Sequence, residues 1–474
     1  MKKILTAVLF LYSIINNCPA QVSVNSSGAS PAASSMLDVS ASNKGMLMPR
    51  MTAAQRKAIG NPAIGLMVFD TDRQAICFFD GQEWRPLLSG TEKTPVVIQR
   101  TGSNSKPQGY FGRSVSIHGN YAVVGAPRDS TSGAAYVFVK ENGNWKQQAK
   151  LVASYMGAND EFGQSVDIYN DIIVVGAPGM KVGANDDQGR VYVFKRTGNN
   201  WQQVIGLQAN SGQANESFGT AVSVYGNTIA IGAPGRDHTN FTDAGAVYIV
   251  RNTSGSWEHR ITIHAPELYS QDYIGFGAAL DLCDTTLLVG APLGSGTGAA
   301  YTFINKDVLG YSWPHDQKFM KDQIPGSGKG FGGSVAMSGD NMIIGMPQYT
   351  FYNQGENGGL WQTYQRNPYN GFWWKTQLIG SYKAYTREGC SVAADGDTFY
   401  IGSEGWTEVD GMVEYKGRVI IFKNNHLRHI YNVDKDIHGF FGASVAADNG
   451  QYIIGAPAMN NYSLGTVTFG MMLE

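Results

Sequence analysis

Short apolar runs alternate with polar turns along most of the chain, which is typical of β-strands rather than helices. In the clearest stretch, the pattern predicts four successive strands at Phe111–Ile117, Tyr121–Ala126, Ala134–Val139 and Trp145–Ala153. The second strand carries Ala-Val-Val in a row, so it is apolar on both sides of the pleat. Because such a strand must be covered on both faces, we expect sheets stacked face to face.

This four-strand unit recurs seven times from about residue 96 to the C-terminus. Each copy begins with Phe-Gly or a variant of it, and the steps between successive pairs are 51, 56, 58, 55, 57 and 53 residues. Each copy then continues to Gly-Ala-Pro or a variant. A fixed period of this length indicates one supersecondary unit per repeat, none of which buries its core alone. The pattern therefore predicts an all-β fold, a seven-bladed β-propeller of four-stranded antiparallel blades. The pairs begin at Phe111, Phe162, Phe218, Phe276, Phe331, Glu388 (a degenerate copy) and Phe441.

The two ends of the repeat region predict how the ring closes. The last repeat stops after its third strand, Thr466–Phe469, while an additional strand, Val96–Arg100, precedes the first Phe-Gly pair. We expect Val96–Arg100 to complete the last blade, because closure removes exposed sheet edges.

Residues 1–20 are predicted to be a signal peptide. Lys2 and Lys3 form its charged start, Ile4–Ile15 its apolar stretch, and Cys18-Pro19-Ala20 its small-residue cleavage site. A lipid-anchored start at Cys18 is the alternative. No later stretch reaches the ~18 apolar residues that a membrane span needs.

Residues 21–95 form a separate N-terminal segment that begins with a Ser-, Ala- and Asn-rich, extended stretch. Thr52–Ile59 is predicted to be a short helix with Thr52 as its cap, and the apolar runs Gly65–Phe69 and Ala75–Phe79 predict a β-hairpin. Residues 96–474 are predicted to be the propeller domain.

Composition narrows the range of partners. The 36 basic and 38 acidic residues nearly balance, which gives no support to a nucleic-acid partner. After cleavage the chain keeps Cys77, Cys283 and Cys390, each in a different structural unit. We expect small buried thiols there rather than a disulfide.

Two segments resemble known families. The repeat, clearest as FGRSVSIHGNYAVVGAP at residues 111–127, resembles the FG-GAP repeat of integrin α subunits and of related exported bacterial proteins. The N-terminal segment at residues 34–84 is similar to a module found on exported proteins of Bacteroidetes-type bacteria. These resemblances imply a seven-bladed propeller and a secreted or cell-surface setting.

Metal binding of the family type is not expected. In the integrin family, calcium loops lie between strands one and two, and the matching loops here, such as residues 338–340 and 395–397, are too short to supply six or more oxygen ligands. No cofactor is therefore predicted. A different metal site could use Asp186 and Asp187, or Asp237 and Asp243, and the alternative is that these are solvated turn residues.

The long loops all belong to one face of the predicted propeller, namely those between strands two and three and between blades. Loops on a rigid scaffold often carry binding function. In blades five and six this face holds aromatic residues that other repeats lack, with Glu404, Glu408 and Asp410 at the expected rim. We expect a patch that binds a glycan or an extended peptide. The alternative is a small core of the loops themselves. The aromatic residues are Tyr349, Phe351, Tyr352, Tyr382, Tyr385 and Trp406.

No hydrolase motif appears, and Gly328, Gly330 and Gly333 match a dinucleotide motif only by letter, because a strand follows them. We therefore expect an exported, non-catalytic binding or adhesion module whose partner is a glycan or protein ligand, with a monomeric propeller. The alternatives are a polysaccharide-active hydrolase or lyase that uses the same face, and a structural component of the cell surface.

Overall fold

The computed structural model divides the chain into two compact units, residues 1–94 and 95–474. The predicted signal peptide lies outside the described residues. The structure describes residues 22–25, 30, 37–41, 43, 46–71, 75–79, 81, 84–86, 98–103, 105–106, 108–267, 274–321, 326–351, 357–380, 385–405, 407–409, 412–414, 417–423, 426–432, 440–457 and 464–472.

The N-terminal unit contains a small sheet and one short helix. The helix α2 (Ala53–Lys57) begins after Thr52, whose hydroxyl accepts a hydrogen bond from the Gln55 backbone in a complete capping box. Arg56 is buried and its Nε donates to Asp70 at 2.8 Å, so this helix is held to the sheet by a buried ion pair. The strands are β1 (Val22–Asn25), β2 (Leu37–Ser40), β3 (Arg50–Met51), β4 (Met67–Asp70), β5 (Ala75–Phe79) and β6 (Trp84–Pro86), with β1 parallel to β2 and the sheet order β3-β4-β5-β6.

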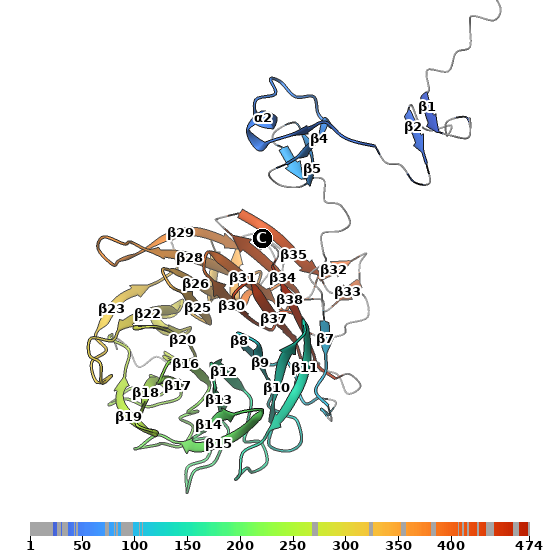
Figure 1. Ribbon diagram of the computed structural model, residues 1–474. Helices are drawn as coiled ribbons and strands as arrows, with labels where there is room; N and C mark the ends of the chain where they lie inside the picture. Colours follow the sequence, from blue (N-terminus) through green and yellow to red (C-terminus); the bar gives the residue numbers. More distant parts are fainter. Residues whose placement is uncertain are drawn as a thin grey trace, which may run out of the picture. The chain divides into compact units, whose positions relative to one another are not determined.

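The second unit is built from four-stranded antiparallel sheets, each formed by one repeat (Figure 1). Six of them use four strands of one repeat in chain order, although the fifth and sixth repeats also insert additional short strands. They are β8 (Ser114–His118), β9 (Tyr121–Ala126), β10 (Ala134–Glu141), β11 (Asn144–Leu151); β12 (Ser165–Tyr169), β13 (Ile172–Ala177), β14 (Arg190–Thr197), β15 (Asn200–Leu207); β16 (Ala221–Tyr225), β17 (Thr228–Ala233), β18 (Ala246–Thr253), β19 (Ser256–Ile263); β20 (Ala279–Cys283), β21 (Thr286–Ala291), β22 (Ala299–Ile304), β23 (His315–Phe319); β25 (Ser334–Ser338), β26 (Asn341–Met346), β28 (Leu360–Arg366), β29 (Trp373–Gly380); and β30 (Glu388–Asp395), β31 (Thr398–Ser403), β34 (Arg418–Lys423), β35 (His426–Asn432).

The remaining sheet takes one strand from the start of the unit. Strands β36 (Ser444–Asp448), β37 (Gln451–Ala456) and β38 (Thr466–Met471) are followed in the sheet by β7 (Ile98–Arg100), which runs antiparallel to β38. The pairing predicted for Val96–Arg100 therefore occurs over Ile98–Arg100, and residues 96–97 lie outside the described residues.

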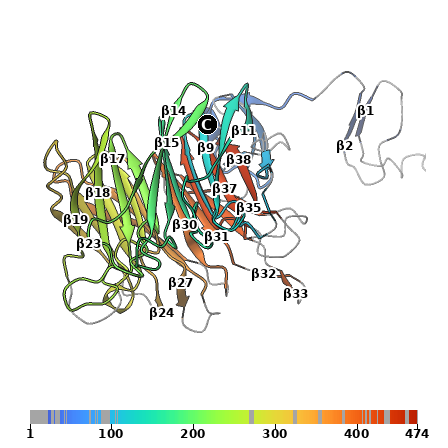
Figure 2. The same ribbon diagram turned by 90° about the horizontal axis from the view of Figure 1, so that it is seen from below.

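The first strands of the sheets line a common centre. Strand β8 contacts β12, and contacts continue in order through β16, β20, β25, β30 and β36, which in turn contacts β8. Figure 2 shows the same unit from below, with the sheets standing side by side. The all-β prediction is confirmed, and the arrangement is consistent with a propeller.

Two glycines from neighbouring repeats explain why the sheets pack so closely. A Cβ added to Gly125 of Gly-Ala-Pro would lie only 2.0 Å from the carbonyl oxygen of Gly163, the Phe-Gly glycine of the next repeat. The degenerate copies keep both glycines, so the motif's essential chemistry is this backbone contact. The same contact, at 1.9–2.2 Å, recurs at Gly176–Gly219, Gly232–Gly277, Gly290–Gly332, Gly345–Gly389, Gly402–Gly442 and Gly455–Gly112.

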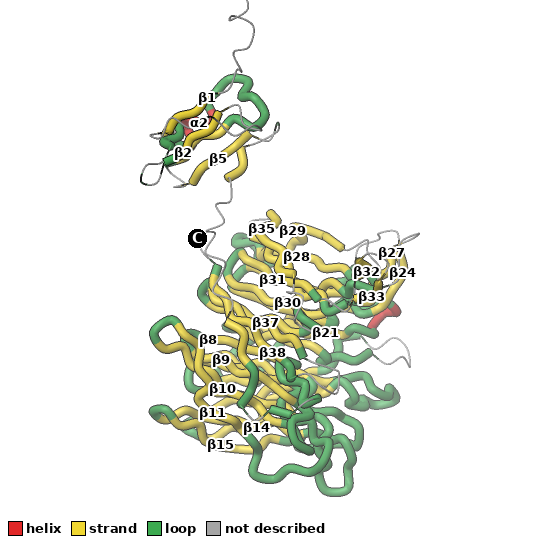
Figure 3. The backbone as a smooth tube through the Cα atoms, turned by 90° about the vertical axis from the view of Figure 1, so that its right-hand side faces the viewer, coloured by secondary structure: helices red, strands yellow, loops and turns green. Residues whose placement is uncertain are grey.

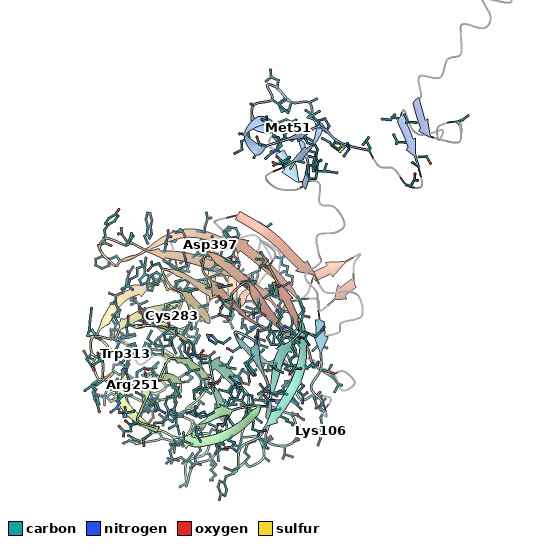
Figure 4. All side chains as sticks on the ribbon, in the orientation of Figure 1. Met51, Lys106, Arg251, Cys283, Trp313 and Asp397 are labelled. Carbon is teal, nitrogen blue, oxygen red and sulfur yellow. The ribbon has the colours of Figure 1, made fainter. Side chains whose placement is uncertain are left out.

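Side chains fill the spaces between the sheets (Figure 4), with Cys283 near the inner strands and Trp313 toward the periphery. The motif phenylalanines are buried in these layers, and Phe111 is fully enclosed. Trp145 of the first sheet stacks on Phe469 of the last, with ring centroids 4.5 Å apart. The three described cysteines, Cys77, Cys283 and Cys390, are free thiols; Cys77 is buried as expected, whereas Cys283 and Cys390 are only half-buried.

Candidate ligand-binding site

The short hairpin turns and the long loops lie on opposite sides of the second unit (Figure 3). The turn between β8 and β9 is short, as are the equivalent turns in the other sheets, which is typical of tight hairpins. The loop between β13 and β14 is much longer, and the corresponding loops in later repeats carry added elements on the same side: η1 (Gly294–Gly296), β27 (Gln348–Phe351), which pairs with β24 (Gly326–Lys329), and the hairpin of β32 (Thr407–Val409) and β33 (Met412–Glu414).

A hollow of about 470 Å³ opens among residues that flank the repeat motifs, and we refer to it as the motif hollow. Its lining positions are equivalent in successive repeats: the residue before Phe, the residue after Gly, and the Pro position and its successor. The repeat thus sets the backbone, while the side chains at these positions vary. The described lining residues are Tyr110, Arg113, Pro127, Arg128, Glu161, Gln164, Gly333, Pro347, Arg387, Cys390, Glu404, Ala443 and Pro457.

Charged side chains dominate the motif hollow. Arg387 Nη1 lies 2.6 Å from Glu404 Oε1, and Glu404 is the more buried partner. The Arg128 guanidinium lies over the Tyr110 ring at 4.9 Å from its centroid, and its Nη1 donates to the Tyr110 hydroxyl at 3.3 Å. Arg113 is exposed and has no side-chain hydrogen bond or ion pair to another described residue.

One thiol forms part of the floor of the motif hollow. Cys390 Sγ accepts from the Glu404 backbone N–H at 3.4 Å and lies 3.4 Å from the Gly442 carbonyl. Burial raises the pKa of Cys390 to about 12, and the nearby Glu404 carboxylate adds to the rise. The thiol is therefore protonated at neutral pH and is not set up as a nucleophile.

A second cavity, the central channel, has a volume of about 280 Å³ and lies between the first strands of the seven sheets. Its wall carries the carboxylates of Asp167 and Asp281. Asp167 Oδ2 accepts from the Val224 backbone N–H at 2.7 Å, and Asp281 Oδ2 accepts from that of Met337 at 2.6 Å. Each carboxylate therefore joins neighbouring sheets.

Together with further hydrogen bonds between the other sheets, these contacts form a belt around the central channel. Burial raises the pKa of Asp281 to about 7, and the Asp167 charge contributes to the rise. Burial also raises the pKa of Asp167, against hydrogen bonds that lower it. The belt is completed by Ser116–Asp167 (2.6 Å), Ser223–Asp281 (3.4 Å), Gly396–Ser338 (2.9 Å), Gly450–Asp395 (2.6 Å) and Gly119–Asp448 (2.7 Å).

The predicted aromatic patch is only partly described. Tyr349 is fully buried in the core of its sheet, where Lys321 Nζ lies 5.2 Å from the ring centroid. Its ring therefore packs inside the blade rather than on an open surface. Phe351 ends β27, and Tyr385 is a half-buried loop residue with φ of 59°. Tyr352, Tyr382, Trp406 and Asp410 lie outside the described residues, as does the side chain of Glu408.

The predicted metal residues fall into two separate loops. Asp186 is paired with Lys181 at 2.6 Å, and Asp187 follows it with φ of 48°. Asp237 Oδ1 accepts from the Asp243 backbone N–H at 2.9 Å, and burial together with the Asp237 charge raises the pKa of Asp243. Among the described residues, no three His, Cys, Asp or Glu side chains gather to hold a metal ion.

Sequence reasoning identified the loop-bearing face and Glu404 but missed the arginines of the motif hollow. Tyr110, Arg113 and Arg128 directly flank the Phe-Gly and Gly-Ala-Pro motifs of the first repeat. The available signal was that these flanking positions change between repeats whose motifs stay fixed. The carboxylates of Asp167 and Asp281 were also missed, because they lie in strands whose apolar pattern predicts only core residues.

Comparisons with known proteins match two family models and several integrin α subunits. The family model described as FG-GAP repeat matches residues 101–138, 145–194 and 201–250, and the model described as phage tail like trimerisation region matches residues 24–104. Integrin alpha-2 of Bos taurus is 28% identical over 203 residues, covering 39% of this chain and 17% of that protein. Integrin alpha-D of Homo sapiens is 30% identical over 148 residues, covering 28% of this chain and 12% of that protein.

The chain spans less than a fifth of the length of these curated relatives. Among solved structures, Sqt1 of Saccharomyces cerevisiae matches with a TM-score of 0.44 and 11% identity, covering 78% of this chain and 99% of that chain. Within the described residues, no helix is long and apolar enough to cross a membrane.

The class that these observations define is an all-β protein of repeated four-stranded antiparallel sheets. The chain carries FG-GAP repeats and is similar in sequence to integrin α subunits.

Proposed function

We propose that residues 96–474 form a closed propeller of seven blades, with β7 as the strand that completes the last blade. The order of contacts among the first strands, with β36 against β8, supports closure. The glycine contact between the last and first repeats, Gly455 to Gly112, has the same geometry as the other six and supports it further.

We infer that the protein is an exported, non-catalytic binding or adhesion module, with residues 1–20 as its signal peptide and residues 21–95 as an N-terminal extension. Similarity to integrin α subunits favours a module of this type. The observation that carries the proposal is the motif hollow, in which side chains that differ between repeats converge on the loop-bearing face. A glycan or protein at the cell surface is the proposed ligand.

The aromatic loops of the fifth and sixth repeats are proposed to extend this surface. Tyr385 and the backbone of Phe351 belong to the described part of those loops, whereas the buried ring of Tyr349 packs in the core. No calcium site of the integrin loop type is proposed. Binding of another metal by Asp186 and Asp187, or by Asp237 and Asp243, would show as a rise in melting temperature when the metal is added.

The experiment is a glycan and protein binding screen of the full chain, combined with analysis of the glycans for cleavage. Binding without cleavage is the expected result. Cleavage of a bound polysaccharide would support the alternative of a hydrolase or lyase on the same face. Absence of both binding and cleavage would contradict the proposal and favour a structural component of the cell surface.

A second candidate function is assembly of three chains through the N-terminal unit. The match of residues 24–104 to a trimerisation region supports it, as does the set of apolar side chains that the described part of this unit exposes. Each propeller would still close within its own chain, as a monomeric propeller. Light scattering on the full chain should then give about three times the mass of one chain, and a single-chain mass would contradict assembly. The exposed side chains, 46–84% accessible, are Val24, Leu37, Val39, Met46, Leu47 and Ile64.

A further inference from the structure

The motif hollow carries unbalanced positive charge. It is lined by three arginines and two glutamates, and the Arg387–Glu404 pair neutralises one charge of each sign. Arg113 and Arg128 are then set against the single carboxylate of Glu161. Both arginines are exposed, and neither is ion-paired to another described residue. An anionic group that enters this hollow would therefore meet guanidinium groups whose hydrogen-bonding capacity is largely unused.

Tyr110 contacts both arginines, through its ring with the Arg128 side chain and through its carbonyl with the Arg113 backbone. The Arg128 guanidinium is stacked on its ring, and the Arg113 backbone N–H donates to the Tyr110 carbonyl at 2.9 Å. Tyr110 itself has φ of 55°, a conformation fixed by the turn that leads into Phe-Gly. Stacking restricts the guanidinium before a ligand arrives, so less conformational entropy is lost on binding.

The remaining polar groups distinguish among anionic ligands. A guanidinium matches a carboxylate with two parallel hydrogen bonds. Glu161 and Gln164 add carboxylate and amide acceptors beside it, and these suit the hydroxyl groups of a sugar. A peptide carboxylate offers no hydroxyls to those acceptors. The volume of about 470 Å³ is in the usual range for small-ligand sites.

We propose that the motif hollow binds an acidic sugar of the uronic acid type, with its carboxylate on Arg113 and Arg128 and its hydroxyls on Glu161 and Gln164. This inference rests on the proposed binding function and specifies its ligand.

The test is calorimetric titration of the full chain with a galacturonic acid trisaccharide and, separately, with its methyl ester. The ester has the same sugar rings without the charge, so we expect it to bind at least tenfold more weakly. Arg113→Gln should weaken binding of the acid about tenfold and leave binding of the ester unchanged. Arg128→Gln is the second variant, in case one substitution prevents folding.

Lys195→Gln is the matched control. Lys195 is exposed in β14, outside the motif hollow, and its loss changes the net charge by the same amount. We expect Lys195→Gln to bind the acid as tightly as the unmodified chain does. Equal weakening by Lys195→Gln and Arg113→Gln would overturn the proposal, since only the overall charge would then matter.

Other outcomes separate this inference from the proposed function. Equal affinity for acid and ester, or binding of a hexaglutamate peptide in place of the trisaccharide, would overturn the acidic-sugar inference. Binding of neutral glycans alone would overturn it too, while leaving the binding function in place. Failure to bind any glycan or protein in the screen would overturn both.

Discussion

Replacing Gly176 by alanine tests whether the contact between motif glycines holds the sheets together. The added Cβ would lie 2.1 Å from the Gly219 carbonyl oxygen and 2.3 Å from Ser165 Oγ. Ordinary contact begins near 3.4 Å, so the Gly219 backbone would have to retreat by about 1.3 Å. The obstacle is a backbone atom of a neighbouring sheet, which cannot turn aside as a flexible side chain can.

The expected cost follows from two contributions. Overpacking a dense interior costs about 1–3 kcal/mol. The same displacement breaks the hydrogen bond that Ser165 Oγ donates to the Gly219 carbonyl at 2.7 Å, for about 1 kcal/mol more. We therefore expect Gly176→Ala to lower the free energy of unfolding by about 2–4 kcal/mol, a large part of the ~5–15 kcal/mol typical of folded proteins.

Urea unfolding followed by tryptophan fluorescence measures this change, and the melting temperature should fall by about 4 °C. Gly157→Ala is the control, because its Cβ would meet only the Asp160 side chain, at 3.3 Å. We expect a change within about 1 kcal/mol for the control. If the two variants unfold at the same urea concentration, the reasoning about motif glycines is wrong.

The other predictions concern the central channel, a half-buried histidine and the contact between the first and last sheets. Because burial raises the pKa of Asp281 to about 7, the folded state holds this proton more tightly, and the stability it gives is lost as pH rises from ~4 to ~7. Asp281→Asn should then gain on the order of 4 kcal/mol relative to the unmodified chain between pH 4 and 8, and parallel pH profiles would contradict this. Burial lowers the pKa of His264 to about 4, so the folding stability linked to this shift is present above pH ~6.5 and lost as pH falls toward 4. His264→Phe should remove that acid sensitivity in thermal melts across this pH range. Trp145→Ala should cost about 3–5 kcal/mol in urea unfolding because it empties a stacked, buried position, whereas Trp374→Ala, at a side chain that is 58% exposed, should cost under ~1 kcal/mol.

The strand pattern was predictable because its causes are local. The apolar run Tyr121–Ala126, bounded by polar turns, appears as β9 with the predicted bounds, and similar runs form its counterparts in the other repeats. The strand expected at Phe111–Ile117 begins only at Ser114. The Phe-Gly pair before it forms the turn that carries the close contact to the neighbouring sheet, and no local preference reports that contact.

For the candidate site, the sequence predicted the side of the sheets on which it lies but not most of its residues. Loop length alone placed the variable residues on one side of the sheets, and Glu404 was among those named. Arg113, Arg128 and Arg387 were not found, because one residue beside each motif carries no periodic signal. Tyr349 was predicted to be a surface aromatic residue, and this was wrong, because its ring is buried in the core.

By itself, the sequence determined the repeat, the four strands of each unit and the need to cover both faces of every sheet, since these follow from residue type and spacing along the chain. The tertiary structure decided which repeats meet, and so which side chains converge. Gly176 meets Gly219 across 43 residues, and Gly455 meets Gly112 across nearly the whole unit. Only that packing brings Arg113, Arg387 and Glu404 into the motif hollow. Which side chains meet there depends on how the sheets are placed around one another, and residues adjacent in sequence do not determine that placement.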